Sequence, residues 1–248
     1  MIIAPYIIDA DGKRVVVKLM DDSWTFNQCV SAHPFKPGTG VVWSHHDHCS
    51  RLPVPGDELP EFIGCVRRTH GNCVVLAWYG EVLLGHLMFL PKAVARERRA
   101  TGWEHFDNTD SDDETLVVVN LAMCSLSGHE FRRKGIGASL VQIMLEWAMQ
   151  NAWKYIEVYD TGGGLFPMEW FDHCIPPRPF WEKKGFVVFQ KHGDGKFSGE
   201  FLRAVLNDNP RNSISEQRQK EEIIQKLREG AIDQEQHAFQ YDLKLSLK

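Results

Sequence analysis

The chain has 248 residues, of which 43% are hydrophobic and 25% charged, and its formal net charge is -5. This composition fits a globular protein of one large domain, with or without an appendage. The acidic balance argues against a general nucleic-acid partner, since such binders are normally basic. No apolar run reaches the ~18 residues of a membrane-spanning helix, so we expect no membrane partner.

The amino end has no cationic segment followed by a long apolar run, so it does not resemble a secretion signal. The sequence contains six cysteines and no Cys-x-x-Cys pair. Such cysteines are typical of free thiols in a reducing compartment, and we therefore expect a cytoplasmic protein.

The first part of the chain predicts a strand, a helix and a β-hairpin. Residues 14–20 alternate as a strand does. Residues 57–68 place apolar side chains on one helical face, with Pro60 in the first turn, where proline is tolerated. Residues 72–91 contain two apolar runs that flank a turn at Gly80, which is the pattern of a hairpin.

The middle of the chain predicts a β-α-β unit. The polar residues 92–114 are expected to form a loop, or a short helix with a loop. Residues 115–124 are a continuous apolar run, which suits a buried central strand. Residues 138–151 have the period of a helix lying on a sheet. Residues 154–160 follow as a second strand, which predicts a right-handed crossover.

The last part of the chain changes character twice. Residues 161–179 are rich in glycine, proline and aromatic residues and form a candidate functional loop. Residues 180–191 have the pattern of a helix end, a glycine stop and a strand. We predict one domain over 1–205 and an appendage over 206–248. The appendage has a charged helix and an alternating strand, which either completes a sheet edge or forms a homodimer.

The segment FRRKGIGA, residues 131–138, stands between the apolar run and the helix. A helix N-terminus exposes unpaired N–H groups, and glycines let the backbone before it curl so that these groups converge. The cations Arg132, Arg133 and Lys134 stand beside them. This combination predicts a phosphate or diphosphate site. Its spacing is neither the GxxxxGK[ST] of a P-loop nor the GxGxxG of a dinucleotide-binding turn.

The pattern Arg-x-x-Gly-x-Gly followed by Ala, at the start of a long helix, resembles the cofactor motif of the GCN5-related N-acetyltransferases (GNAT). The segment RPFWEKKGFVVF, residues 178–189, is similar to the late helix-to-strand segment of that family. The resemblance covers residues 70–190. It implies an α/β fold with a mixed, mostly antiparallel sheet, whose central parallel strands splay apart and which is flanked by helices.

The resemblance also implies acetyl coenzyme A, or another acyl coenzyme A, as the acyl donor. The diphosphate would lie on the glycine turn, and the pantetheine arm would lie along the end of the central strand. The residues implied to bind the cofactor are Met123, Cys124, Ser125, Leu126, Arg132, Arg133, Lys134, Gly135, Ile136, Gly137, Ala138, Phe180 and Lys183.

Acyl transfer to an amine needs an acceptor for the amine proton, donors for the oxyanion and a proton for the leaving thiolate. Many family members supply that proton from a tyrosine of the late segment. Trp181 stands at that position here, and an indole N–H cannot usefully deliver a proton. Candidate acid–base residues are Glu114, Asp160 and His173, although each can equally be a solvated side chain.

The predicted function is transfer of an acyl group, acetyl first, from coenzyme A to a primary amine of a small molecule or peptide by direct attack. A non-catalytic acetyl-CoA-binding module that regulates a partner is the alternative that the missing tyrosine favours. A metal-dependent binding protein would use the histidines of residues 43–49. The second half of such a zinc site is poorly spaced, so we predict no metal.

Overall fold

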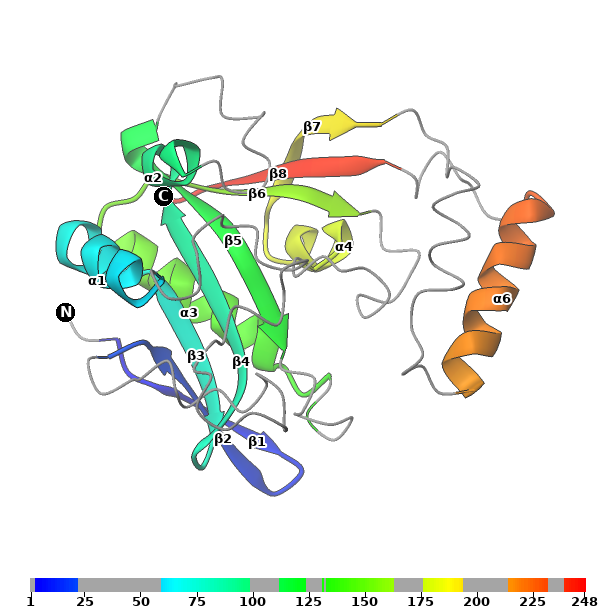
Figure 1. Ribbon diagram of the computed structural model, residues 1–248, viewed down its shortest axis with the longest axis horizontal. Coiled ribbons are helices and arrows are strands. Elements are labelled where there is room, and N and C mark those ends of the chain that lie inside the picture. The colour runs from blue at the N-terminus through cyan, green and yellow to red at the C-terminus, as the bar shows by residue number, and fades with distance from the viewer. Residues whose placement is uncertain are drawn as a thin grey trace. The chain divides into compact units, whose positions relative to one another are not determined.

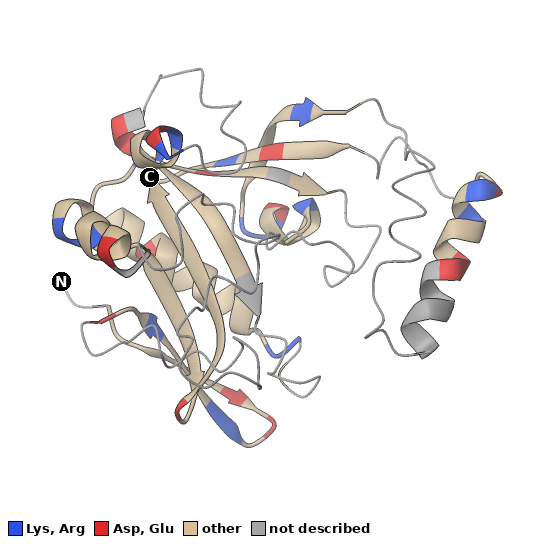
Figure 2. Ribbon diagram, in the orientation of Figure 1, with Lys and Arg blue, Asp and Glu red and all other residues tan. Residues whose placement is uncertain are grey.

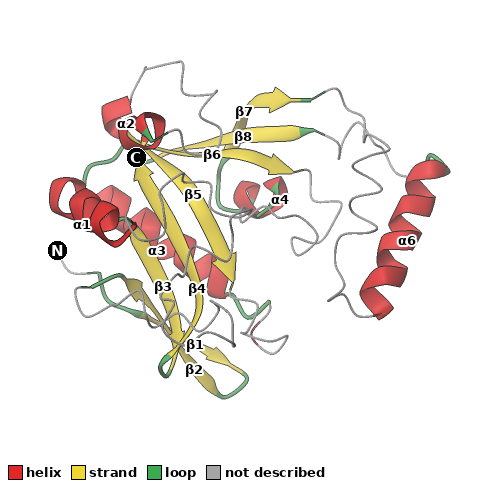
Figure 3. Ribbon diagram, viewed as in Figure 1, coloured by secondary structure: helices red, strands yellow, loops and turns green. Residues whose placement is uncertain are grey.

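The structure is a computed structural model, and it describes residues 3–21, 59–98, 112–123, 131, 133–162, 176–193, 214–231 and 239–248. Two compact units make up the chain. The first consists of Met1–Val158 with Leu245–Lys248, and the second of Tyr159–Lys244. Figure 1 labels their elements and Figure 3 separates helices from strands.

The first unit is built on a mixed, mostly antiparallel sheet, as the sequence predicts. Its strands lie side by side in chain order, and neighbours are antiparallel except for the last pair, which is parallel. The strands are β1 (Tyr6–Ala10), β2 (Lys13–Leu19), β3 (Val74–Tyr79), β4 (Val82–Pro91), β5 (Thr115–Met123) and β6 (Tyr155–Gly162), of which β6 belongs to the first unit only up to Val158.

Among the described residues, three α-helices accompany this sheet: α1 (Leu59–His70), α2 (Lys92–Glu97) and α3 (Ile136–Gln150). Helix α3 contacts β2 to β5 and lies behind β3 and β4 in the view of Figure 1. Its predicted inward side chains are all buried: Leu140, Ile143, Met144, Trp147 and Ala148. No helix in the described part of the chain is long and apolar enough to cross a membrane.

The predicted hairpin and central strand are confirmed. Strands β3 and β4 flank Gly80, and β4 ends at Pro91 as expected. Every residue of β5 from Thr115 to Leu121 is buried, and all of them except Thr115 and Asn120 are apolar, as suits a central strand. Helix α1 is shifted two residues toward the carboxyl end of its predicted range, and its Phe62, Ile63 and Val66 are buried as predicted.

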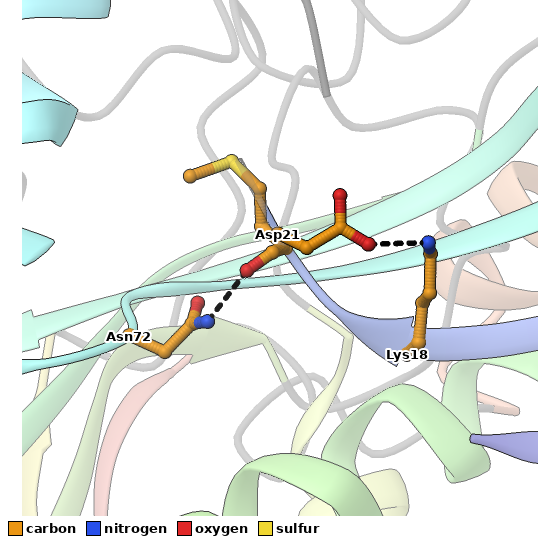
Figure 4. A network of polar contacts seen from close by, with 4 residues as sticks. Lys18, Asp21 and Asn72 are labelled. Atoms are coloured by element: carbon orange, nitrogen blue, oxygen red, sulfur yellow. Dashed lines mark hydrogen bonds and ion pairs between the residues drawn. The ribbon is translucent and has the colours of Figure 1, made fainter. Parts of the chain in front are cut away.

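Asn72 fixes the start of β3 against the end of β2 (Figure 4). Its side-chain Nδ2 donates to the carbonyl oxygen of Met20 at 2.7 Å. Its Oδ1 accepts from the backbone N–H groups of Cys73 at 3.0 Å and Val74 at 3.2 Å. These three bonds give hydrogen-bond partners to the backbone groups of Met20, Cys73 and Val74. Because the first of them joins the end of β2 to the start of β3, they fix the β2–β3 register at this end.

An ion pair is buried inside the first unit. The Lys92 ammonium, at the start of α2, lies 3.2 Å from a carboxylate oxygen of Glu157 on β6. The two side chains are only 6% and 2% exposed. Burial of two charges is tolerated here because each neutralises the other.

The second unit contains α4 (Arg178–Glu182), β7 (Val187–His192), α6 (Ile214–Arg228) and β8 (Gln240–Ser246). The predicted glycine stop after α4 is confirmed by Gly185, whose φ of 89° is left-handed. Strand β8 pairs antiparallel with β7 and stands between β6 and β7 in the strand order. The alternating tail therefore has a strand on each side.

Candidate functional site

Two hairpin turns and the carboxyl end of β5 meet at one end of the first unit's sheet. The register places Val15, just after the β1–β2 turn, opposite Tyr79, just before the β3–β4 turn. It also places Gly85 of β4 opposite Met123, the last residue of β5. The turn that leads into α3 lies at this end of the sheet, because Phe131 contacts Tyr79 and Lys134 contacts Asp11.

The backbone of the turn before α3 alternates in handedness. Arg133 and Gly135 have left-handed φ values of 58° and 85°, and Lys134 between them does not. Such alternation directs successive N–H groups toward one point, forming a concave anion site called a nest. Gly135 is the N-cap of α3, and the first helical bond runs from the N–H of Ser139 to its carbonyl at 3.0 Å. The helix therefore offers no acceptor to the N–H groups of Ile136 and Gly137.

Open space lies beside this backbone. A Cβ atom added at Gly135 or at Gly137 would meet no atom within 4 Å. A ligand can therefore approach the N–H groups closely from these positions. The residues present thus fit a phosphate-bearing cofactor, because the donors, the open approach and the positive end of the helix coincide.

Cations and aromatic rings surround the turn. Phe131 is 4% exposed, and its ring centroid lies 5.3 Å from that of Tyr79. The Lys13 ammonium stands 5.1 Å from the Phe131 centroid and 6.0 Å from the Tyr79 centroid. The Lys134 ammonium forms an ion pair of 2.6 Å with a carboxylate oxygen of Asp11. Figure 2 shows that the β1–β2 turn carries residues of both charge signs.

A β-bulge interrupts β5 halfway along its length. Met88 of β4 pairs with Asn120, whereas its neighbour Phe89 pairs with Val118, so Val119 is an extra residue on β5. The parallel ladder joins Thr115–Val118 to Tyr155–Val158. A bulge bends its strand and increases the local twist, which is consistent with the ladder ending at Val118.

From Val119 onward, β5 pairs with β4 alone among the strands that the structure describes. The opposite edge of this segment presents backbone groups that an extended ligand can pair with as an added strand. This edge leads directly to Met123 and then to the chain that carries the glycine turn. The first unit thus places a strand edge and an anion nest on consecutive parts of the chain.

The structure brings six of the predicted cofactor residues together in the turn: Arg133, Lys134, Gly135, Ile136, Gly137 and Ala138. Met123 closes β5. Cys124, Ser125, Leu126 and Arg132 lie outside the described residues. In the second unit, Phe180 of α4 is half-buried, and Lys183 directly after α4 is exposed.

Among the predicted acid–base residues, Glu114 is the one whose side chain is described. It precedes the first residue of β5 and pairs with Lys154 at 2.5 Å, where its hydrogen bond and charge raise the pKa of Lys154. The backbone N–H of Lys154, just past the end of α3, also donates to the carbonyl oxygen of Glu114 at 3.0 Å. The glycine turn lies at the other end of this 15-residue helix, roughly 20 Å away at the rise of a helix. The structure therefore does not bring Glu114 to the turn. Asp160 is on β6 with its side chain outside the described residues, as is all of His173.

Trp181 is completely buried. Its indole N–H donates to the carbonyl oxygen of Pro176 at 2.9 Å. The rings of Phe180 and Phe186 meet it edge-on, each with a centroid distance of 5.2 Å. The side chain thus packs the second unit, and its N–H is already used by a backbone acceptor.

Sequence reasoning missed three features of the first unit: the ion pair of Asp11, the placement of Lys13 and the bulge at Val119. The Asp11-Gly12 turn between two apolar runs is a hairpin signal that could have located the first two. The bulge has no such signal, because it falls within the uniform run Val117-Val118-Val119.

The histidines of residues 43–49 lie outside the described residues. Within the described residues, no group of three or more His, Cys, Asp or Glu side chains is arranged to hold a metal ion. Cys73 is buried, and this burial raises the pKa of its thiol to about 12, partly opposed by the charge of Arg67. Metal binding requires a thiolate, so this cysteine is a poor ligand.

Comparison with known proteins gives matches of structure alone, since no family model and no curated protein matches the sequence. An N-acetyltransferase from Staphylococcus aureus Mu50 is 10% identical with a TM-score of 0.49, over 94% of this chain and 99% of that one. A GNAT family acetyltransferase from Elizabethkingia anophelis with acetyl-CoA bound is 14% identical with a TM-score of 0.41, over 94% and 98%.

A Bacillus subtilis acetyltransferase in complex with CoA is 18% identical with a TM-score of 0.37, over 79% of this chain and 95% of that one. At TM-scores below 0.5, these likenesses do not decide the function. The chain's own residues must support it.

Proposed function

We propose that this chain is an acetyl-CoA-dependent N-acetyltransferase of the GNAT family. The observation that carries the proposal is the open nest at Arg133–Ala138, which follows a bulged central strand and begins a long helix. The Arg-x-x-Gly-x-Gly-Ala motif spans residues 132–138 and therefore includes the residues of this nest in its sequence. A diphosphate is the anion that such a combination of N–H groups and helix N-terminus suits best.

Each part of the site has a role in holding the acyl donor. The N–H groups of the turn and the Lys134 ammonium bind the diphosphate. The edge of β5 from Val119 to Met123 orients the pantetheine arm through backbone hydrogen bonds. When bound, acetyl-CoA supplies a thioester, an activated acyl group with a fair leaving group.

The chain's contribution to the transfer itself is chiefly positioning. The amine attacks in its neutral form and directly, without a covalent intermediate on the protein. Alignment of amine and acyl group can supply a large share of the rate enhancement. Trp181 does not protonate the leaving thiolate, because its N–H is bonded to Pro176. Asp160 and His173 stay candidates for the proton acceptor.

The acceptor is a primary amine of a small molecule, with a peptide second. The division into an acyltransferase domain over 1–205 and an appendage over 206–248 stays a prediction, as does the cytoplasmic location. A homodimer through the C-terminal strand is also untested. Since β8 has strands on both sides, such a dimer would exchange β8 between two copies rather than extend an open edge.

A second candidate is a non-catalytic module that binds acetyl-CoA and regulates a partner. The burial of Trp181 favours it, because the position that holds a tyrosine acid in many family members serves packing here. This module would share the diphosphate site. It differs from the enzyme in releasing no thiol in the presence of an amine.

A thiol-release assay separates the two. Purified protein is mixed with acetyl-CoA and longer acyl donors over a broad panel of primary amines, including polyamines, amino sugars and peptide N-termini. We expect at least one amine to give release of free coenzyme A at a rate well above that of the same mixture without protein. Tight binding of acetyl-CoA with no turnover across the panel would support the regulatory module instead.

A further inference from the structure

The positive turn already has an anion beside it. Asp11 lies at the tip of the β1–β2 hairpin with a φ of 57°, and its carboxylate is 2.6 Å from the Lys134 ammonium. The side chain of Asp11 is 73% exposed and that of Lys134 is 32% exposed. The hairpin and the turn are far apart in the chain, so this contact joins two separate parts of the first unit.

The same ammonium cannot serve two anions fully. Lys134 directly precedes the N-cap Gly135, so its charge is one of those that a diphosphate on the nest would use. A carboxylate that pairs with this ammonium reduces the positive electrostatic potential at the nest. Because the ion pair is partly exposed, its strength is small enough for a diphosphate to overcome.

We propose that Asp11 is an internal competitor for the diphosphate site, holding Lys134 when the site is empty and lowering the affinity for coenzyme A. This inference rests on the proposed function, since it assigns a role to a residue beside the same nest. A ligand with a single weak negative charge gains little by displacing Asp11. A diphosphate carries more negative charge and gains more from the freed ammonium, so the contact favours diphosphate ligands over singly charged ones. The carboxylate of Asp11 also assists release, because it takes back the ammonium when the ligand leaves.

The test is Asp11→Asn, measured by calorimetry with coenzyme A and with inorganic diphosphate at fixed ionic strength. Asparagine keeps the shape of the side chain and tolerates a left-handed φ, so the hairpin turn is retained. We expect the affinity for both ligands to rise about threefold to fivefold, the range of an exposed ion pair.

Two further variants make the test specific. Glu81→Gln removes one negative charge from the neighbouring β3–β4 turn, where Glu81 is exposed, and should change the affinity less than twofold. In a Lys134→Gln background, Asp11→Asn should give no gain, because the two residues act through one contact.

The outcomes separate this inference from the function on which it rests. If the wild-type protein binds coenzyme A but Asp11→Asn binds equally or more weakly, the competitor role is wrong and the function stands. A gain of equal size in Glu81→Gln, or one that persists without Lys134, would likewise overturn it in favour of a general charge effect. If the wild-type protein binds neither ligand, the proposed function fails and takes this inference with it.

Discussion

Gly137→Asp is expected to lower the affinity for coenzyme A at least about a hundredfold, whereas Gly137→Ala should keep it within about threefold. The aspartate would occupy the open space beside Gly137 with a negative charge. Repulsion of a diphosphate a few ångströms away is worth ~3 kcal/mol or more in a partly desolvated site. An alanine methyl group carries no charge, so it does not repel the diphosphate. Isothermal calorimetry measures both variants.

Gly137 is a better position for this test than Gly135, because neither aspartate nor alanine at position 137 should destabilise the folded protein. Gly137 lies inside α3 without a left-handed φ, and an added Cβ meets no atom. Alanine should stabilise the helix by roughly 0.5–1 kcal/mol, and an acidic residue in the first turn is also favourable. Gly135→Asp should lose binding as well, but its φ of 85° adds strain.

Thermal unfolding monitored by circular dichroism provides the control for this prediction. Both Gly137 variants should unfold at or above the wild-type temperature. Coenzyme A binding by Gly137→Asp with wild-type affinity would mean that the diphosphate does not lie on this turn.

Lys92→Met should destabilise the protein by about 3–5 kcal/mol, the cost of removing one charge from a buried ion pair. The variant retains the Glu157 carboxylate, which is 2% exposed, without the ammonium that neutralises it. The double variant Lys92→Met/Glu157→Gln should recover a large part of this loss, because it removes both charges. Urea unfolding followed by fluorescence measures the three proteins.

Lys154→Met is the matched control for this measurement. It breaks the ion pair with Glu114, whose two side chains are 59% and 44% exposed. Solvent screens such a pair, so no measurable change in stability is expected. Equal effects of Lys92→Met and Lys154→Met would show that the buried pair has no special role.

The sequence alone predicted the elements whose side chains follow one pattern. Strand β5 is mostly apolar because it is buried from Thr115 to Leu121, and α3 repeats its apolar residues with the helical period because one face lies on the sheet. The nest could be predicted because all of its residues are consecutive in the sequence, so no contact with a distant part of the chain is needed to form it. Local chemistry, the glycines and the helix start, determines its shape without help from the rest of the fold.

The parts that sequence reasoning missed depend on contacts across the fold or on partial burial. Strand β1 is short, and its sequence YIIDA does not alternate between apolar and polar residues although every second residue is exposed, so the sequence does not mark it as a strand. The partnership of Asp11 with Lys134 arises only when β2 and β5 take their places in one sheet. Glu114 was a reasonable candidate by its position before β5, but the direction of that strand carries it away from the turn.

In the proposed function, the main-chain N–H groups at the start of α3 hold the diphosphate of a coenzyme A thioester. The most direct measurement is a titration of isotope-labelled protein with coenzyme A, following backbone amide signals by NMR. We expect the amide signals of Arg133 to Ala138 to shift most, and inorganic diphosphate to shift the same set. If saturating coenzyme A leaves these amide signals unshifted, the diphosphate does not bind at this turn.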